Sequence, residues 1–201
     1  MKKGFTLIEL LVVIAIIIIL AAILLPYIIN RVEESRISRM VGEIRSLKTA
    51  VLLYYNDLSV FPNTWDDFVS NGPTNPQWKG PYIEKIPNST TATWTEASPW
   101  KTNFRLIVEY DNQGFNFAGQ TNYNFTKGIA LEVVNPHTAG INVIPRTSLE
   151  KIDRELDDGS PTTGLIVGGQ PNANSLSTIT ITTQGYSENN VSLYVLLQGL
   201  R

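Results

Sequence analysis

The chain contains 201 residues, of which 43% are hydrophobic and 17% charged, and its formal net charge is −2. This composition argues against a generally basic nucleic-acid-binding domain and against intrinsic disorder. Because there is no cysteine, disulfides, thiolate metal sites and cysteine nucleophiles are excluded, and the single histidine leaves one position for histidine chemistry. The average conceals an asymmetry, because the first 29 residues are mostly apolar and the rest resembles a soluble domain.

The N-terminal segment is long and apolar enough to span a membrane. Leu10–Leu25 contains 16 consecutive apolar residues. As a helix, Phe5–Ile29 would be about 37 Å long, and the hydrocarbon core of a bilayer is about 30 Å thick. Lys2 and Lys3 precede this segment and predict that the N-terminus stays on the cytoplasmic side. A secretory signal peptide or a plain membrane anchor would have the same features.

Glu9 is not explained by a plain anchor. An acidic side chain costs about 2.5–3.5 kcal/mol at the membrane centre and less near the interface. In a membrane, Glu9 is expected to lack a strong partner, which makes it a functional candidate. It lies in the sequence GFTLIEL, which starts at Gly4, follows a short basic leader and precedes the apolar segment. This combination resembles the class III signal of type IV pilins and type II secretion pseudopilins.

The resemblance implies that a prepilin peptidase cuts the chain after Gly4 and that the new N-terminal residue, Phe5, is N-methylated. It also implies that Glu9 meets the positive N-terminal amine of a neighbouring subunit in a filament. Methylation keeps the positive charge, so this contact is charge-assisted. Removing one member of a buried ion pair costs about 3–5 kcal/mol. Glu9 is therefore predicted to set the register between subunits.

Pro26 predicts a weak point in the helix. Proline has no N–H, and its ring clashes with the carbonyl four residues earlier, here that of Ala22. The β-branched residues Ile16–Ile19 are mildly unfavourable for a helix. One interpretation is a kinked membrane helix. The other, implied by the resemblance, is a segment that melts when the subunit enters the filament.

The pattern changes after residue 29 to that of an amphipathic helix. From Ile37 onward apolar residues recur every three or four positions, and the pairs Glu33–Arg36 and Arg39–Glu43 have helical spacing. This helix is predicted to end near Asn56. The sequence thus divides into a leader at 1–4, a hydrophobic transmembrane or filament-core helix at 5–29, an amphipathic helix at 30–56 and a globular head at 57–201.

The head is predicted to contain an antiparallel sheet. Turn formers fill residues 57–100, with a short helix at 64–69 capped by Asn63 or Thr64. The tryptophans of this region either staple an irregular loop to the long helix or form a binding surface. Strand-like runs occur at 104–111, 129–134, 140–145, 164–168, 177–183 and 191–198, with a turn at 111–114. The predicted fold is α+β, the type IV pilin fold, with four to six strands packed on the C-terminal half of the long helix.

A looser resemblance, to the major pseudopilin of type II secretion, covers roughly residues 3–105. It is carried by Asp57 before the Phe61-Pro62 turn, by the sequence WKGPYI from Trp78, and by Ser98-Pro99-Trp100. The chain departs from the family in having Ser98 in place of an aspartate and Lys101 in place of a glycine. It is also longer than that protein usually is.

Asp153, Asp157 and Asp158 are candidate calcium ligands. The family's calcium-binding C-terminal loop has no segment that aligns with this chain, but these residues offer carboxylate oxygens, which calcium prefers. The alternative interpretation is a solvated turn at a helix end. Type IV pilins commonly fasten this end of the head with a disulfide. Without cysteine, this chain must use packing or a metal.

The sequence contains no feature that indicates an enzyme. The resemblance implies a structural subunit of a type IV pilus or pseudopilus, stored in the bacterial inner membrane and then polymerised into a periplasmic or extracellular filament. The implied partners are other copies, prepilin peptidase, and an inner-membrane assembly platform with its cytoplasmic ATPase. No nucleic acid and no cofactor besides calcium are predicted. The alternatives are a minor initiating pseudopilin, an adhesive or DNA-uptake subunit, and a monomeric exported protein with a plain anchor.

Overall fold

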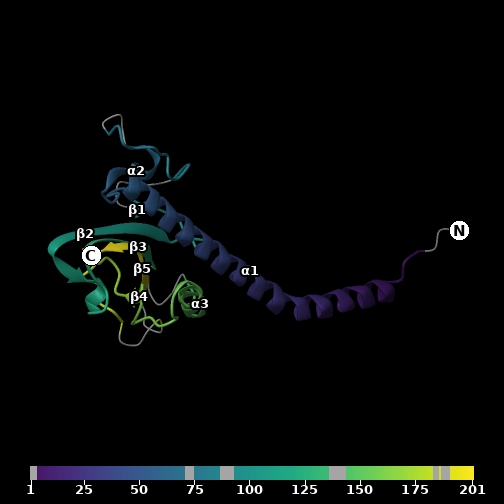
Figure 1. Cartoon of the computed structure of the whole chain (residues 1–201). Helices are drawn as coiled ribbons and strands as arrows, with labels where there is room; N and C mark the ends of the chain where they lie inside the picture. The colour runs from purple at the N-terminus through teal and green to yellow at the C-terminus, as the bar shows by residue number, and fades with distance from the viewer. Residues whose placement is uncertain (1–3, 71–74, 87–92, 136–143, 183–185, 187–190) are drawn as a thin grey trace. The chain divides into compact units, whose positions relative to one another are not determined.

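The computed structural model describes residues 4–70, 75–86, 93–135, 144–182, 186 and 191–201. The chain forms two compact units, Met1–Arg36 and Ile37–Arg201. One long helix, α1 (Leu7–Leu58), contributes its first part to one unit and its second part to the other (Figure 1).

In the first unit the side chains of α1 are exposed. Every residue from Gly4 to Val32 is exposed, and Ile18, in the middle of the apolar segment, retains 65% of its accessible surface. Among the described residues, α1 is the one helix long and apolar enough to cross a membrane. No described residue of this unit covers its apolar surface.

In the second unit α1 buries the predicted apolar stripe. The buried residues are Ile37, Met40, Val41, Ile44, Leu47, Ala50, Val51, Tyr54 and Leu58. Their spacing of three or four residues places them on one face of the helix. The helix ends at Leu58, close to the predicted position. There Ser59 takes the left-handed conformation (φ +57°), and its N–H donates to the carbonyl of Tyr55 at 2.7 Å.

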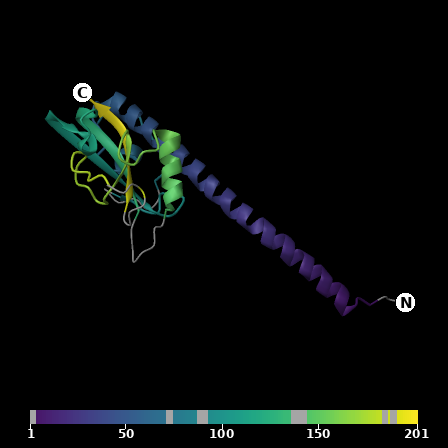
Figure 2. The same cartoon turned by 90° about the horizontal axis from the view of Figure 1, so that it is seen from below.

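The head contains one five-stranded antiparallel sheet with the strand order β1-β2-β3-β5-β4. The strands are β1 (Thr93–Trp94), β2 (Asn103–Asn116), β3 (Asn124–Val134), β4 (Ile166–Gly169) and β5 (Ser192–Leu200). The other elements are α2 (Asp66–Val69), the 3-10 helix η1 (Phe117–Gly119) and α3 (Arg146–Leu156) (Figures 1 and 2). This arrangement confirms the predicted α+β fold.

Both faces of the sheet are buried. Along β5, Leu193, Val195 and Leu197 belong to a core shared with α1 and α3. Tyr194 and Leu196 alternate with them and belong to a second core on the opposite face. That second core is closed by η1 and by the irregular segment 170–182, which contributes apolar side chains but no helix. The sheet therefore lies between a helical layer and a loop layer.

Residues 177–182 do not form the predicted strand. Thr178 Oγ1 donates to the carbonyl of Ser175 at 3.1 Å, and Ser177 Oγ donates to Glu109 Oε1 at 2.7 Å. Hydroxyl bonds of this kind compete with the hydrogen bonds of a strand. Within the described residues, this segment joins the sheet through a single isolated bridge, between Gly169 and Ile181.

A predicted turn and a predicted helix cap also differ from the structure. The predicted turn at 111–114 is absent: β2 continues through it, its register with β3 shifts between Tyr110 and Phe115, and Gly114 takes a positive φ of +86°. Helix α2 lacks the predicted side-chain cap. Instead Asp67 Oδ2 accepts hydrogen bonds from the N–H groups of Asn63 (2.8 Å) and Thr64 (2.9 Å). Most of the predicted strand at 140–145 lies outside the described residues.

Candidate functional site

Helix α1 begins with a reciprocal cap between Thr6 and Glu9. Glu9 Oε2 accepts hydrogen bonds from the Thr6 N–H (2.8 Å) and from the Thr6 hydroxyl (2.7 Å), and the Glu9 N–H lies 3.3 Å from Thr6 Oγ1. This is a capping box, with threonine at the N-cap and glutamate three residues later. Within one chain, Thr6 therefore gives Glu9 two neutral hydrogen bonds, and no basic side chain of the described residues pairs with it.

The second carboxylate oxygen of Glu9 remains uncommitted. Both bonds from Thr6 go to Oε2, and Oε1 has no hydrogen-bond partner among the described residues. Glu9 is also exposed. A cationic group from outside the chain can therefore bind Oε1 without displacing the cap.

Gly4 and Phe5 precede the helix in an exposed, non-helical segment. The Phe5 side chain retains 83% of its accessible surface. A Cβ atom at Gly4 would meet no atom within 4 Å, and the backbone φ there is not positive. The fold therefore does not require glycine at this position, and the peptide bond after Gly4 is accessible.

Pro26 lies inside α1, which continues without a break to Leu58. Proline removes one backbone hydrogen bond from the helix at this point. The residues around Pro26 are all exposed, so no packing within the unit compensates for the missing bond. Melting at this position stays a prediction.

A polar cluster that the sequence analysis missed follows Pro26. Arg31 Nε donates to the Tyr27 hydroxyl at 3.0 Å, its guanidinium carbon lies 5.0 Å from the centre of the Tyr27 ring, and Nη1 pairs with Glu34 at 2.9 Å. Tyrosine and basic residues are enriched where a membrane segment reaches water. The spacings of three and four residues in the sequence could have revealed this cluster.

The tryptophans of residues 57–100 lie in the core and its edge. Trp65 is fully buried and packs edge-on against Trp94, with 5.4 Å between ring centres. Trp78 donates to the carbonyl of Asp67 at 3.2 Å. These contacts attach the irregular segment to the head, which favours the stapling interpretation over a tryptophan-based binding surface.

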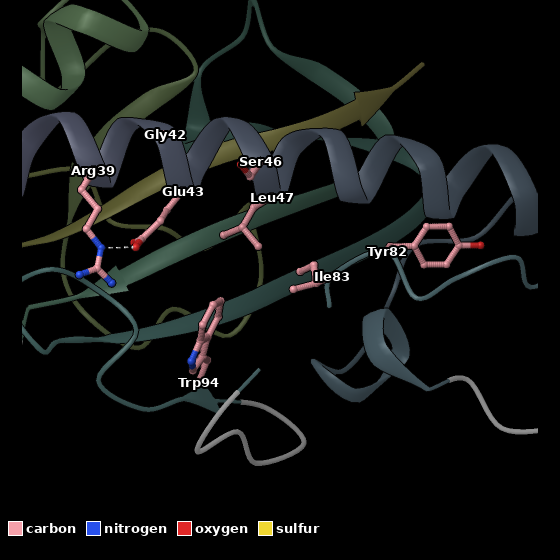
Figure 3. A pocket seen from close by; sticks show the side chains of 8 residues that line it. All are labelled: Arg39, Gly42, Glu43, Ser46, Leu47, Tyr82, Ile83 and Trp94. Carbon is pink, nitrogen blue, oxygen red and sulfur yellow. Dashed lines mark hydrogen bonds and ion pairs between the residues drawn. The ribbon is translucent and has the colours of Figure 1, made fainter. Parts of the chain in front are cut away.

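An open hollow of about 470 Å³ lies beside α1 in the head (Figure 3). It is lined by Arg39, Gly42, Glu43, Ser46, Leu47, Tyr82, Ile83 and Trp94. Glu43 Oε1 accepts a hydrogen bond from Arg39 Nε at 2.8 Å, but Glu43 Oε2 is buried without a partner. Burial raises the pKa of Glu43, although the hydrogen bond and the charge of Arg39 oppose this shift.

A second group that the sequence analysis missed is a polar clamp on the loop-facing side of the sheet. Glu132 of β3 is fully buried and paired with Arg105 of β2, whose Nε lies 2.7 Å from Oε2. Glu132 Oε1 accepts hydrogen bonds from the Asn172 N–H (2.8 Å) and from the Tyr194 hydroxyl (3.0 Å). The clamp thus fastens the 170–174 loop to three adjacent strands.

The three candidate metal ligands lie together at the C-terminal end of α3. One carboxylate oxygen from each of Asp153, Asp157 and Asp158 lies within 4.8 Å of the other two. Asp157 Oδ2 accepts hydrogen bonds from two backbone N–H groups at the start of β4. Asp158 accepts from the Ser160 N–H (2.7 Å) and the Thr163 hydroxyl (2.7 Å). These two aspartates organise the loop between α3 and β4.

Asp153 differs from its two neighbours because it is fully buried. Its Oδ2 accepts a hydrogen bond from the Tyr186 hydroxyl at 2.7 Å, and its Oδ1 is buried without a partner. Burial, together with the charges of Asp158 and Asp157, raises the pKa of Asp153 to about 6, although the Tyr186 hydroxyl and the Gly159 backbone oppose this shift.

Comparisons with known proteins agree with the geometry of the N-terminal segment. Residues 1–25 match the family described as "Prokaryotic N-terminal methylation motif", and residues 31–116 match "PilW, C-terminal". The chain is 33% identical over 114 residues to the type II secretion system core protein G of Pseudomonas aeruginosa, a match that covers 53% of this chain and 74% of that protein. The chain belongs to the type IV pilin and type II pseudopilin family.

Other relatives of this pilin-like chain come from both branches of the family. The type II secretion system core protein G of Vibrio cholerae is 30% identical over 116 residues, covering 55% of this chain and 73% of that protein. Fimbrial protein Q of Moraxella bovis is 58% identical over 50 residues, covering 25% of this chain and 32% of that protein. The similarity is thus longer to a secretion protein and higher, over a shorter stretch, to a fimbrial protein.

Proposed function

We propose that the protein is a structural subunit of a type IV pilus or pseudopilus filament. It is inserted in the bacterial inner membrane with its N-terminus inside, cut after Gly4 and N-methylated at Phe5. It then polymerises through its N-terminal helix into a periplasmic or extracellular filament. Prepilin peptidase, an assembly platform and a cytoplasmic ATPase act on it. The division into a leader (1–4), a core helix (5–29), an amphipathic helix (30–56) and a head (57–201) is part of this proposal.

The observation that carries this proposal is the exposure of the apolar segment to solvent. Every residue from Gly4 to Val32 is exposed, so this surface needs a bilayer or other helices on all sides. Within it, Glu9 keeps one carboxylate oxygen free while Thr6 occupies the other. In a bundle of such helices, the free oxygen binds the Phe5 amine of a neighbouring copy. That amine exists only after the chain has been cut at Gly4.

Two substitutions separate the register role of Glu9 from its capping role. Glu9→Gln keeps an acceptor for Thr6, because glutamine also serves in a capping box, but it removes the charge. Thr6→Ala removes the hydroxyl of the cap and keeps the charge. We expect Glu9→Gln to abolish filaments and Thr6→Ala to retain them, at equal protein levels. Equal assembly by the two variants would contradict the register role.

The maturation steps are tested by mass spectrometry of the protein purified from its native cell. The expected N-terminal residue is N-methylated Phe5, recovered both from membranes and from sheared filaments. A chain that retains residues 1–4 and never enters a polymer would instead support a plain anchor.

The longer similarity to core protein G favours a pseudopilus subunit over a fimbrial one. The second candidate is a minor, initiating pseudopilin, which would be present in few copies per filament. Quantifying the protein in sheared filaments relative to the other filament proteins distinguishes the two roles, because a major subunit dominates the polymer.

A further inference from the structure

We propose that a small hollow formed by the 170–174 loop and residues 178–180 binds one unit of a neutral carbohydrate. The hollow has a volume of about 240 Å³ and is open to solvent. Pockets for drug-sized ligands begin at about 300 Å³, so this one has room for about one sugar ring. The site lies in the head and does not depend on the proposed filament role.

The lining of the hollow is polar and, among the described residues, carries no charge. Its polar members are Gln170, Asn172, Asn174, Thr178 and Thr180. Phosphate and other anions are bound by arginine or lysine, and metal cations by carboxylates, so this lining suits neither. An amide both donates and accepts hydrogen bonds, as each hydroxyl group of a sugar does. Pro171 and Ala173 complete the lining and offer apolar atoms to the C–H face of a sugar ring.

Most of these polar side chains are available to a ligand. In the part of the chain that the structure describes, the side chains of Gln170, Asn172, Asn174 and Thr180 form no hydrogen bond to the protein, and all four residues are exposed. A single exposed amide is ordinary, because water satisfies it. Here three amides and a hydroxyl converge on one hollow, where a polyhydroxylated ligand replaces several waters at once.

The buried polar clamp fixes the loop that carries these side chains. The Asn172 N–H donates to Glu132 Oε1 at 2.8 Å, and the Ala173 N–H donates to the Tyr194 hydroxyl oxygen at 3.2 Å. Arg105 donates to the carbonyl of Ala173. The loop therefore uses its backbone to bond to the sheet and keeps its amide side chains for a ligand. Because the loop is already ordered, binding a sugar costs little conformational entropy.

This arrangement also gives the clamp a function. Glu132 is fully buried and pairs with Arg105, and a buried ion pair of this kind is often no more stabilising than apolar residues of the same size. Stability alone therefore does not account for it. Holding a binding loop in one conformation does, since a binding site is most effective when supporting hydrogen bonds fix the residues that touch the ligand.

The test titrates the full chain in detergent with sugars and follows the side-chain amide signals of asparagine and glutamine by NMR. The probes are glucose, galactose, mannose and N-acetylglucosamine, each up to about 10 mM, ten times a Kd of about 1 mM. We expect at least one of them to shift the signals of Asn172 and Asn174 saturably. Glucuronate and glucosamine, which are charged, should bind no more tightly than glucose, because the lining offers no opposite charge.

Variants of the lining locate the binding site. Asn174→Ala should weaken binding about two- to tenfold, the range for one lost hydrogen bond. Asn172→Gly removes the second amide and keeps the positive φ of +66° at this position, so the double variant should bind more than about tenfold more weakly. Gln77→Ala removes an exposed amide elsewhere on the head and is the matched control. It should bind the sugar as the wild type does.

Tyr194→Phe tests the clamp, because it leaves the lining unchanged and removes the oxygen that accepts from the Ala173 N–H. We expect it to weaken sugar binding at least about twofold, whereas wild-type affinity would contradict the role of the clamp. The proposal as a whole is overturned if no neutral sugar shifts the two signals, if a charged sugar binds more tightly, or if the double variant binds like the wild type. Should the double variant not fold, Asn174→Ala alone decides. An oligosaccharide of the bound unit separates the two sources, since tighter binding than that of the single sugar indicates a longer glycan and equal binding a free sugar.

Discussion

The two parts of helix α1 differ in the exposure of their apolar side chains. Leu20, in the first part, retains 55% of its accessible surface, whereas Met40 and Val51, in the second part, are fully buried. The second part has one apolar stripe and a charged face, so a single sheet is enough to cover it. The first part is apolar on all sides, and no single sheet could cover it. The periodicity of the apolar residues therefore indicates on how many of its sides a helix must be covered by other elements.

The acidic residues of the two units repeat this contrast. Glu132 lies in the core of the head, where Arg105, Tyr194 and a loop N–H satisfy both of its oxygens. Glu9 lies in the apolar segment, where Thr6 satisfies one oxygen and leaves the other free. The polar contacts of Glu132 are thus completed within one chain. The N-terminal unit leaves a contact to be completed from outside.

Removing the Glu132 carboxylate should have the largest effect. We expect Glu132→Ala to lower the free energy of unfolding by about 3–5 kcal/mol, because Arg105 then keeps a largely buried charge without an acidic partner and retains only the carbonyl of Ala173. Denaturant unfolding of the full chain in detergent measures this loss. Glu9→Gln should leave head unfolding unchanged. The double variant Arg105→Met/Glu132→Leu should recover most of the stability, and failure to recover it would show that the clamp does more than balance charge.

The same substitution in the two parts of α1 tests the contrast directly. Leu47 is 4% exposed and packs in the main core, so Leu47→Ala should cost about 2–5 kcal/mol of head stability. Leu20→Ala should leave the unfolding of the head unchanged, because Leu20 has no cover within its own unit. Both variants are compared with the wild type in the same denaturant titration. A loss for Leu20→Ala near that for Leu47→Ala would contradict the independence of the two units.

The sequence was most informative where the determining contacts are local. The stripe that starts at Ile37 was predicted correctly, because helical periodicity needs only neighbours three or four residues apart. The ion pairs Glu33–Arg36 and Arg39–Glu43 form for the same reason. The processing site proposed at Gly4 also depends on a short motif, at residues 4–9, and stays a prediction. The hydrogen bonds between Thr6 and Glu9 could also have been predicted, since a threonine three residues before a glutamate is typical of a capping box.

Features that depend on strand order could not be predicted. The clamp requires Arg105, Glu132 and Tyr194 to face one another across three strands, and their separation in the sequence gives no sign of this. The buried Asp153 accepts a hydrogen bond from Tyr186, which lies 33 residues further along the chain. Residues 177–182 have the alternation of a strand, but their hydroxyls bond locally and to Glu109 instead.

Glu43 extends the comparison between the acidic side chains of the two units. It lies on the buried side of α1 in the head and, like Glu9, has one carboxylate oxygen without a partner. Burial raises its pKa in the folded state, so the folded protein binds a proton there more tightly than the unfolded chain does. The resulting stabilisation is complete below the ordinary glutamate pKa and is lost as the pH rises through the raised value. Glu43→Gln removes this dependence, so its stability relative to the wild type should improve between pH 4 and pH 8.

The change expected for Glu43→Gln is at most about 1 kcal/mol, the scale of a partly exposed ion pair. Thermal unfolding across this pH range measures it. Glu150→Gln is the matched control, since Glu150 pairs with Arg146 at the same helical spacing and at 3.0 Å. If Glu43→Gln is instead less stable than the wild type at pH 8, its bond to Arg39 outweighs the burial of the carboxylate. In that case ionised Glu43 is stable beside the hollow. The head then resembles the N-terminal unit in containing an acidic side chain with one oxygen that has no partner.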